Sequence, residues 1–194
     1  MVRKYDSSNR RKAAARTRQD ILQAALRLHW EGVTGFEPLA REAGCSVATV
    51  RKHFPTKEML FQNCTRTFIE TLTPPDLPTL GEIADPVERI EAGVNELCRI
   101  HEAMFGYAWL GAHQRKDSPT LEAEMAAYDG LADAVSGLIA PHGTAEAAPV
   151  RGLLDFLTYR AMRLSGRLSP GQAREELTNI VKTLISGAGR PPAP

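Results

Sequence analysis

Apolar residues recur every three or four positions along most of the chain, and this spacing constrains the fold more than any other feature. Each apolar stripe ends at a proline, a glycine or a capping residue, as at Ser118-Pro119 and Ser169-Pro170. We find no segment with the two-residue alternation of a β-strand and no internal repeat. The sequence therefore predicts an all-α protein of about nine helices.

Charge is distributed unevenly along the 194 residues, although the formal net charge is only +1. Residues 1–58 hold 12 Lys and Arg against 6 Asp and Glu, a balance of +6. Residues 59–194 hold 12 against 17, a balance of −5. Such an asymmetry is typical of a protein that meets a polyanion with one end. By itself it fits a basic tail on an ordinary domain equally well.

Membrane segments and disulfides are not expected in this chain. No apolar run approaches the roughly 20 residues that a transmembrane helix needs, and the basic N-terminus lacks the apolar segment of a secretory signal. The three cysteines are an odd number at unrelated spacings, which argues against a disulfide framework. We therefore expect a cytoplasmic protein with no membrane partner.

Two short helical segments joined by a glycine turn lie in the basic part, within residues 40–58. The first is expected to end at Gly44, and the second to run from the cap Ser46 to His53. This arrangement is a helix-turn-helix, whose second helix fits the major groove of DNA. The pattern favours binding of double-stranded DNA.

Flanking helices complete this DNA-binding domain. One helix is expected over residues 16–30, the next begins at Thr34 through a capping box with Glu37, and a longer one follows the cap Thr56. The residues expected to form the three-helix core are Leu22, Phe36, Leu39, Val50 and Phe54. The residues expected to face outward are Val47, Ala48, Arg51 and Lys52.

A known family signature is similar to residues 39–60. They read LAREAGCSVATVRKHFPTKEML and resemble the signature of tetracycline-repressor (TetR) family transcription regulators. The positions that agree are Ala40, Ala43, Gly44, Ser46, Thr49, His53, Phe54, Lys57, Glu58 and Leu60. With the preceding helix the resemblance covers about residues 16–70. The rest of the chain agrees only in length and in its all-α pattern.

The pattern and the resemblance together divide the chain into three parts: a basic flexible arm (1–15), a helix-turn-helix domain (16–72) whose last helix connects onward, and a ligand-binding and dimerisation domain (73–194). The resemblance implies a homodimer that binds a palindromic operator and leaves it when a small molecule enters the body. The candidates for the dimer interface are Leu153, Leu157, Ala161, Leu164, Ile180, Val181 and Leu184.

The resemblance also implies roles for single residues at the DNA. Those expected at phosphates are Thr34, Thr49, His53 and Lys57, together with the helix start capped by Ser46. Those expected nearest the base edges are Val47, Ala48 and Lys52. The basic segment from Arg10 to Arg18 would reach the adjacent minor groove.

Three departures from the family pattern concern this domain, of which Pro38 in place of a common acidic residue is the least consequential. Arg51 stands where the family usually has tyrosine, and its guanidinium can bind the same phosphate or a guanine edge. A solvated arginine on an exposed face is the alternative. The link between the first two helices, HWEGVTGF, is about three residues shorter than in the family, which leaves the angle of the first helix open.

Residues 98–113 are the richest source of side chains for an effector pocket, which in proteins is mostly apolar. The candidates for effector contact are Cys98, His101, Phe105, Trp109, Tyr128 and Phe156. Ordinary core packing is the alternative for each of them. Cys98 and His101 share a helix face and could both bind a metal ion, but two ligands do not make a site. We expect neither a metal nor a cofactor.

Catalytic patterns are not found in the sequence: there is no phosphate loop, dinucleotide fingerprint or nucleophile elbow. The prediction is a regulator of transcription, not an enzyme. It would bind a palindromic operator as a homodimer and respond to a largely apolar small molecule. The alternative from another class is a related protein that has lost operator specificity and serves as a small-molecule binding module.

Overall fold

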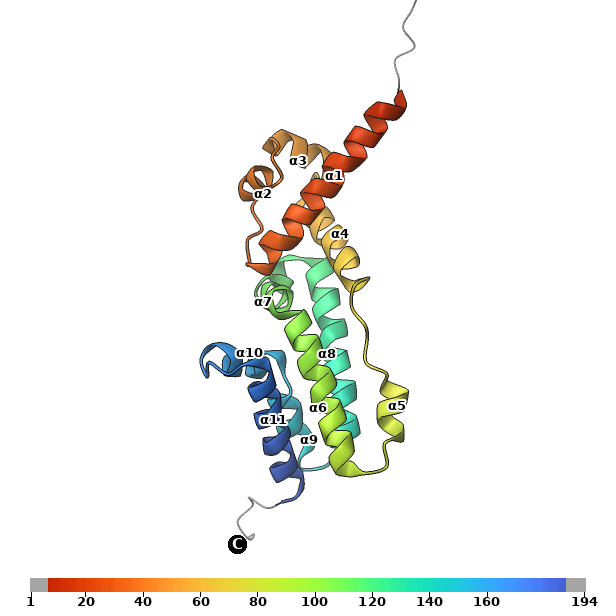
Figure 1. Ribbon diagram of the computed structural model, residues 1–194, viewed down its shortest axis with the longest axis vertical. Coiled ribbons are helices and arrows are strands. Elements are labelled where there is room, and N and C mark those ends of the chain that lie inside the picture. The colour runs from red at the N-terminus through yellow and green to blue at the C-terminus, as the bar shows by residue number, and fades with distance from the viewer. Residues whose placement is uncertain (1–6, 188–194) are drawn as a thin grey trace, which may run out of the picture. The chain divides into compact units, whose positions relative to one another are not determined.

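The structure, a computed structural model, describes residues 7–187, which form eleven α-helices and one 3-10 helix without any strand (Figure 1). The all-α prediction is confirmed, and the expected number of about nine helices is close. The helices are α1 (Ser7–Trp30), α2 (Phe36–Glu42), α3 (Val47–His53), α4 (Lys57–Ile69), α5 (Leu77–Glu82), α6 (Pro86–Ala103), α7 (Phe105–Gln114), the 3-10 helix η1 (Arg115–Asp117), α8 (Pro119–Ile139), α9 (Ala147–Leu153), α10 (Phe156–Leu164) and α11 (Pro170–Ile185). Among these helices, none has the length and apolar character needed to cross a bilayer.

The described chain falls into two compact units. The first, here called the head, contains residues 7–71 and 109–124, and the second, the body, contains residues 72–108 and 125–187. The expected body was continuous from residue 73, whereas residues 109–124 belong to the head. They do so because Leu110 and Leu121 pack with Phe61 of α4 in a buried apolar cluster.

Helix α1 begins nine residues before the expected start at Arg16. Residues 7–15 of the predicted flexible arm are therefore helical, which corrects that prediction. The reason is local, because the run Lys12-Ala13-Ala14-Ala15 consists of strong helix formers. The remainder of the predicted arm, residues 1–6, lies outside the described residues.

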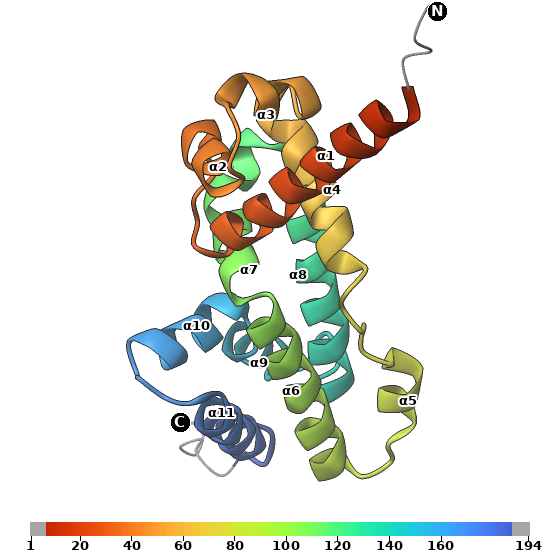
Figure 2. The same ribbon diagram turned by 45° about the horizontal axis from the view of Figure 1, so that its top comes forward.

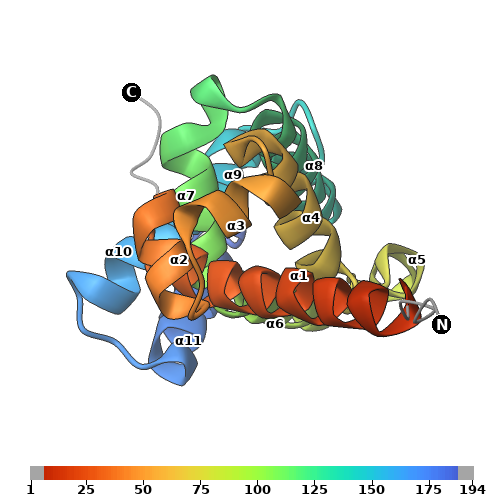
Figure 3. The same cartoon turned by 90° about the horizontal axis from the view of Figure 1, so that it is seen from above.

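The larger apolar core of the head lies where α1 contacts α2, α3 and α4 (Figures 2 and 3). Its buried residues are Ile21, Leu22, Ala24, Ala25, Phe36, Leu39, Ala40, Val50, Phe54, Leu60 and Cys64. All five residues predicted for this core are among them. At the turn, Gly44 adopts a φ of +64°, and the Cys45 N–H donates to the carbonyl oxygen of Ala40 at 2.9 Å. This geometry ends α2 and directs the chain into α3.

Helix α2 begins differently from the prediction. Its N-cap is Gly35, which has no side chain to accept a hydrogen bond, so the capping box expected from Thr34 and Glu37 is wrong. With Phe36 as the first helical residue, Pro38 is the third. Its missing N–H is harmless there, because the first four N–H groups of a helix have no partner within the helix.

In the body, aspartate caps begin two of the short helices. Within the proline-rich stretch 73–81, Asp76 accepts a hydrogen bond from the Thr79 N–H at 3.1 Å and begins α5. The apolar stripe over residues 150–164 is divided between α9 and α10, because Asp155 caps α10 by accepting from the Leu157 N–H at 2.8 Å. Helices α6 and α11 are in contact over a common core.

Candidate nucleic-acid interface

Helix α3 has an inner and an outer face. Its cap Ser46 accepts a hydrogen bond from the Thr49 N–H at 3.1 Å, as predicted, and Val50 is fully buried. Ala48 is exposed, as are the two basic residues of the helix, in agreement with the prediction. Val47 is a correction: it is half-buried and packs against the head core, because residues three apart on a helix share a face.

The residues predicted to contact DNA surround this outer face. Those with exposed side chains are Ser46, Ala48, Arg51, Lys52 and Lys57. Those that are half-buried are Thr34, Val47, Thr49 and His53. Thr56 caps α4 by accepting from the Met59 N–H at 3.1 Å, which makes Lys57 the first residue of that helix. Cationic side chains at the end of α3 and the start of α4 are thus only a short link apart.

Arg51 is exposed but is not simply solvated. The carbon at the centre of its guanidinium lies 4.8 Å from the centroid of the Phe36 ring. A guanidinium over an aromatic face is held by a cation–π interaction, and its N–H edges remain free to bind an acceptor. Arg51 therefore packs on the head where the family usually has a tyrosine, and it still presents donors outward.

Arg18 does not belong to a mobile arm. Its guanidinium lies 4.8 Å from the centroid of the Phe54 ring and donates to Asn63 Oδ1 at 2.6 Å. Arg18 is thus held against the head by residues 36 and 45 positions further along the chain. That the segment from Arg10 to Arg18 reaches the minor groove stays a prediction.

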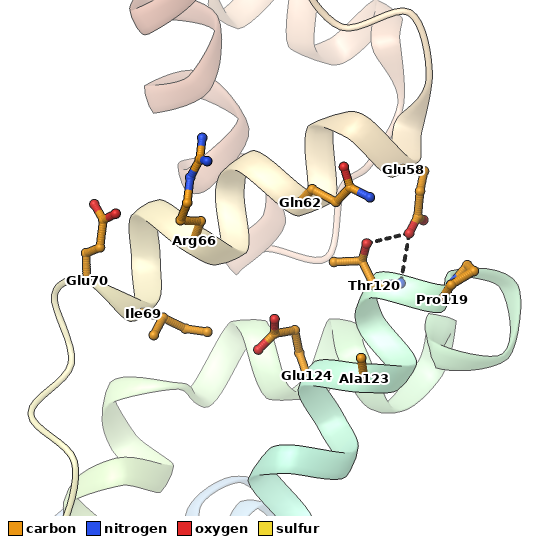
Figure 4. Close-up of a pocket in the computed structure, with 9 residues that line it drawn as sticks. All are labelled: Glu58, Gln62, Arg66, Ile69, Glu70, Pro119, Thr120, Ala123 and Glu124. Carbon is orange, nitrogen blue, oxygen red and sulfur yellow. Dashed lines mark hydrogen bonds between the residues drawn. The ribbon is translucent and has the colours of Figure 1, made fainter.

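Glu58 joins α4 to the first turn of α8 within the head (Figure 4). Its carboxylate accepts from Ser118 Oγ at 2.6 Å, from the Thr120 N–H at 2.8 Å and from the Thr120 hydroxyl. Burial raises the pKa of Glu58, but these hydrogen bonds outweigh burial and leave the pKa below its ordinary value. Glu58 thus supplies an acceptor to the start of a helix that is remote in sequence.

Beside this contact lies a pocket of about 560 Å³ between α4 and the start of α8 (Figure 4). Its lining residues are Glu58, Gln62, Arg66, Ile69, Glu70, Pro119, Thr120, Ala123 and Glu124. The volume is in the range of small-molecule sites, and four of the lining residues carry charged side chains. Sequence analysis missed this pocket because its two walls are separated by about fifty residues of chain.

The aromatic residues predicted for the effector site meet around His101 in the body. The Nε2–H of His101 donates to the Leu154 carbonyl oxygen at 3.0 Å, so in the neutral ring Nδ1 accepts from the Tyr128 hydroxyl. The Phe156 ring lies 5.9 Å from the imidazole and 6.1 Å from the ring of Phe105. Burial lowers the pKa of His101 to about 4. His101, Phe105, Tyr128 and Phe156 thus form one packed cluster.

Two predicted effector residues lie elsewhere. Trp109 belongs to the head, where its ring centroid is 3.6 Å from that of His113. Cys98 is buried and lines a separate body pocket of about 310 Å³. That pocket is lined by Asn95, Cys98, Arg99, Glu102, Tyr159, Pro170, Gly171 and Arg174. Its lining includes three charged residues, Arg99, Glu102 and Arg174.

Glu102 is a polar centre that sequence analysis did not single out. It accepts from the Tyr159 hydroxyl at 2.7 Å and from two guanidinium nitrogens of Arg163, each at 3.1 Å. Burial raises the pKa of Glu102, but these partners outweigh burial and lower it overall. The contacts tie α6 to α10. Only the spacing of Tyr159 and Arg163, one helical turn apart, could have indicated a shared partner.

The fold and this surface define a class of protein: an all-α chain whose head carries a helix-turn-helix with an exposed basic face. No protein-family model and no curated protein matches the sequence. A transcriptional regulator from Rhodococcus sp. Rha1 has a similar structure, with 22% identity and a TM-score of 0.59 over 88% of this chain and 96% of its own. A TetR-like transcriptional regulator from Rhodococcus sp. RHA1 is 16% identical, with a TM-score of 0.59 over 90% of this chain and 97% of its own. These likenesses confirm the fold expected from the TetR resemblance.

Proposed function

We propose that this chain is a TetR-family transcriptional regulator that represses a palindromic operator and releases it on binding a small molecule. The observation that carries the proposal is the outer face of α3, where Arg51 and Lys52 are exposed while Val50 anchors the helix in the core. The charge balance of +6 over residues 1–58 adds attraction to DNA phosphates. The chain would act in the cytoplasm by binding and not by catalysis.

At the DNA, α3 would lie in the major groove, which admits one helix. Its exposed residues Ala48 and Lys52 would then be nearest the base edges. Phosphates on either side would be bound by residues at the helix ends and the adjoining helix. The candidates for these phosphate contacts are Thr34, Ser46, Thr49, His53 and Lys57.

For recognition of a palindrome, two chains would associate through α10 and α11, which contact each other in the body. The exposed apolar side chains support this proposal, since Leu157, Leu164 and Ile180 are 52%, 55% and 41% exposed. Of the other candidates, Val181 is fully buried in the chain's own core, and Leu153 and Leu184 pack against that core while staying partly exposed.

A charge in this apolar face is expected to prevent dimerisation. Leu157→Glu places the charge in the first turn of α10, where a carboxylate favours the helix, so the monomer should still fold. Light scattering after gel filtration should report a monomer for Leu157→Glu. Val87→Glu, which changes an equally exposed apolar residue on α6, should remain dimeric. A dimeric Leu157→Glu protein would place the interface elsewhere.

The effector would bind in the body and act through α7 and α8, which each run from one unit into the other without a break. The cluster around His101 lies on helices that include both of these. A ligand that displaces Tyr128 or Phe105 would therefore move a helix that continues into the head. This is the physical basis for a small molecule that changes DNA binding.

Selection of bound duplexes from a random DNA pool tests the proposal, at physiological salt because affinity for DNA depends on it. Enrichment of one inverted repeat is the expected result. A folded dimer that enriches no sequence would favour the alternative, a small-molecule binding module without operator specificity. Addition of compounds to the enriched duplex would then identify the effector class by loss of binding.

Arg51→Ala is expected to weaken operator binding by about 1–3 kcal/mol if Arg51 contacts a base. Preference at one position of each half-site should then relax, whereas an equal loss on all sequences would indicate a phosphate contact. Arg51→Lys is the matched control, because it keeps the charge and loses the planar donor group. A loss below ~0.3 kcal/mol, well under the range for a base contact, would remove Arg51 from the interface.

A further inference from the structure

Two arginines of the head converge on one amide oxygen. Asn63 on α4 donates from Nδ2 to the Met59 carbonyl oxygen at 2.7 Å, which fixes the orientation of its amide. Its Oδ1 accepts from a terminal guanidinium nitrogen of Arg18 at 2.6 Å and from one of Arg66 at 3.1 Å. A carbonyl oxygen has two lone pairs, so Oδ1 of Asn63 is fully used and positions both cations.

Most donors of these two cations remain unused. Each guanidinium carries five N–H groups, and the contact with Asn63 uses one from each. Arg66 is exposed, Arg18 is half-exposed, and the ring of Phe54 supports Arg18 from one side. In Figure 4 the guanidinium of Arg66 points away from the residues of α8. Within residues 7–187, neither arginine has a carboxylate at ion-pair distance.

The choice of a neutral residue at position 63 is the informative point. Two positive groups that share one acceptor repel each other, and a carboxylate at this position would offset one of the two charges and hold both groups more strongly. An asparagine holds the same geometry without adding a negative charge between the two cations. An external oxyanion can supply the missing charge and accept hydrogen bonds from both guanidinium groups at once.

We propose that Arg18 and Arg66 form a binding site for a phosphate group, positioned by Asn63. The group is either a phosphodiester of the DNA backbone or the phosphate of a small molecule. The first source rests on the proposed function, because it needs bound DNA, and the second does not. The site extends the basic surface of the head beyond α3 and the start of α4.

Inorganic phosphate is the probe for the site itself. It is titrated at constant ionic strength against chloride while the NMR signals of arginine side-chain N–H groups are followed. Saturable shifts at Arg18 and Arg66 are expected. Arg66→Gln should weaken phosphate binding about tenfold or more, which corresponds to the loss of a charge-assisted hydrogen bond. Arg89→Gln removes the same charge from α6 in the body and should have no effect.

Asn63→Asp distinguishes a phosphate-binding site from a contact that only holds α1 against α4. The new carboxylate should occupy both guanidinium groups, raise the melting temperature and abolish phosphate binding. If the arginines only hold α1 to α4, the melting temperature should rise in the same way, but the wild-type protein should show no saturable phosphate shift. A wild-type protein without that shift, and with a DNA affinity that Asn63→Asp leaves unchanged, would overturn the proposal.

The salt dependence of DNA affinity identifies the source of the phosphate. If it belongs to the DNA backbone, Arg66→Gln should reduce the slope of log affinity against log salt by about 1. An unchanged slope together with saturable phosphate binding would assign the site to a small molecule. A wild-type protein that enriches no DNA sequence would refute the proposed function, while the phosphate titration would still decide the site.

Discussion

Replacing His101 with leucine is expected to make the protein less stable near neutral pH and also less sensitive to acid. His101 is 1% exposed, and both of its ring nitrogens are hydrogen-bonded, one with Tyr128 and one with Leu154. Leucine fills most of the space but leaves both partners unsatisfied. The expected loss in the free energy of unfolding is about 2–4 kcal/mol, mainly from two buried groups without partners.

The acid sensitivity follows from the pKa of His101. Burial is the main cause that lowers this pKa from 6.5 to about 4, against smaller opposing effects of the Leu154 carbonyl and Asp155. Between these two values the unfolded chain binds more protons than the folded one. Above about pH 6.5 the folded protein therefore has its full stability with respect to His101. As the pH falls towards 4, the free energy of unfolding decreases by up to about 3 kcal/mol. Leucine cannot titrate, so the variant lacks this loss.

Urea unfolding at about pH 7 and about pH 5 measures both effects, since the pH slope of stability reports the difference in bound protons. His113→Leu, at an exposed position of α7, should leave the pH slope unchanged. His29 in the head is also buried, and burial lowers its pKa to about 4, so His101→Leu should remove only part of the acid sensitivity. An unaltered pH slope in His101→Leu would contradict the assignment.

Glu58→Ala is expected to destabilise the head by about 2–3 kcal/mol, because hydrogen bonds to a charged group are lost and buried donors stay unpaired. The donors are the hydroxyls of Ser118 and Thr120 and the Thr120 N–H, and Ser118 is only 2% exposed. The carboxylate also lies at the N-terminus of α8, where negative charge is favourable. Hydrogen exchange should show earlier opening of α4 and of the first turns of α8.

The matched control for Glu58→Ala is Glu122→Ala. Glu122 forms an ion pair with Arg115 at 2.8 Å in the same unit, but its side chain is 53% exposed. Such exposed pairs contribute little to stability because water screens them, so Glu122→Ala should have a small effect. Glu58→Gln keeps one acceptor and should lose about half as much as Glu58→Ala, on the scale of one hydrogen bond. Equal stability of the two alanine variants would show that the Glu58 contact is not structural.

Helix starts show how far local sequence reasoning reaches. The caps at Ser46, Thr56 and Ser169 are confirmed, as is the acceptance of the Leu121 N–H by Ser118 at 3.2 Å. Each of these contacts spans three residues, so residue type and spacing are enough to predict it. Where two start signals adjoin, the prediction was wrong, as at α2, which begins after Gly35 and not after Thr34.

The sequence by itself determined the helical class, several helix starts, the head core and the exposed basic residues of α3, since these depend on residues within one or two helical turns. Only the tertiary structure decided which side chains distant in sequence contact one another. Arg18 meets Asn63 across 45 residues, and Glu58 meets Thr120 across 62. His101 takes its partners from 27 and 53 residues away. Periodicity shows which face of a helix is buried, but the residue it meets depends on how the helices pack.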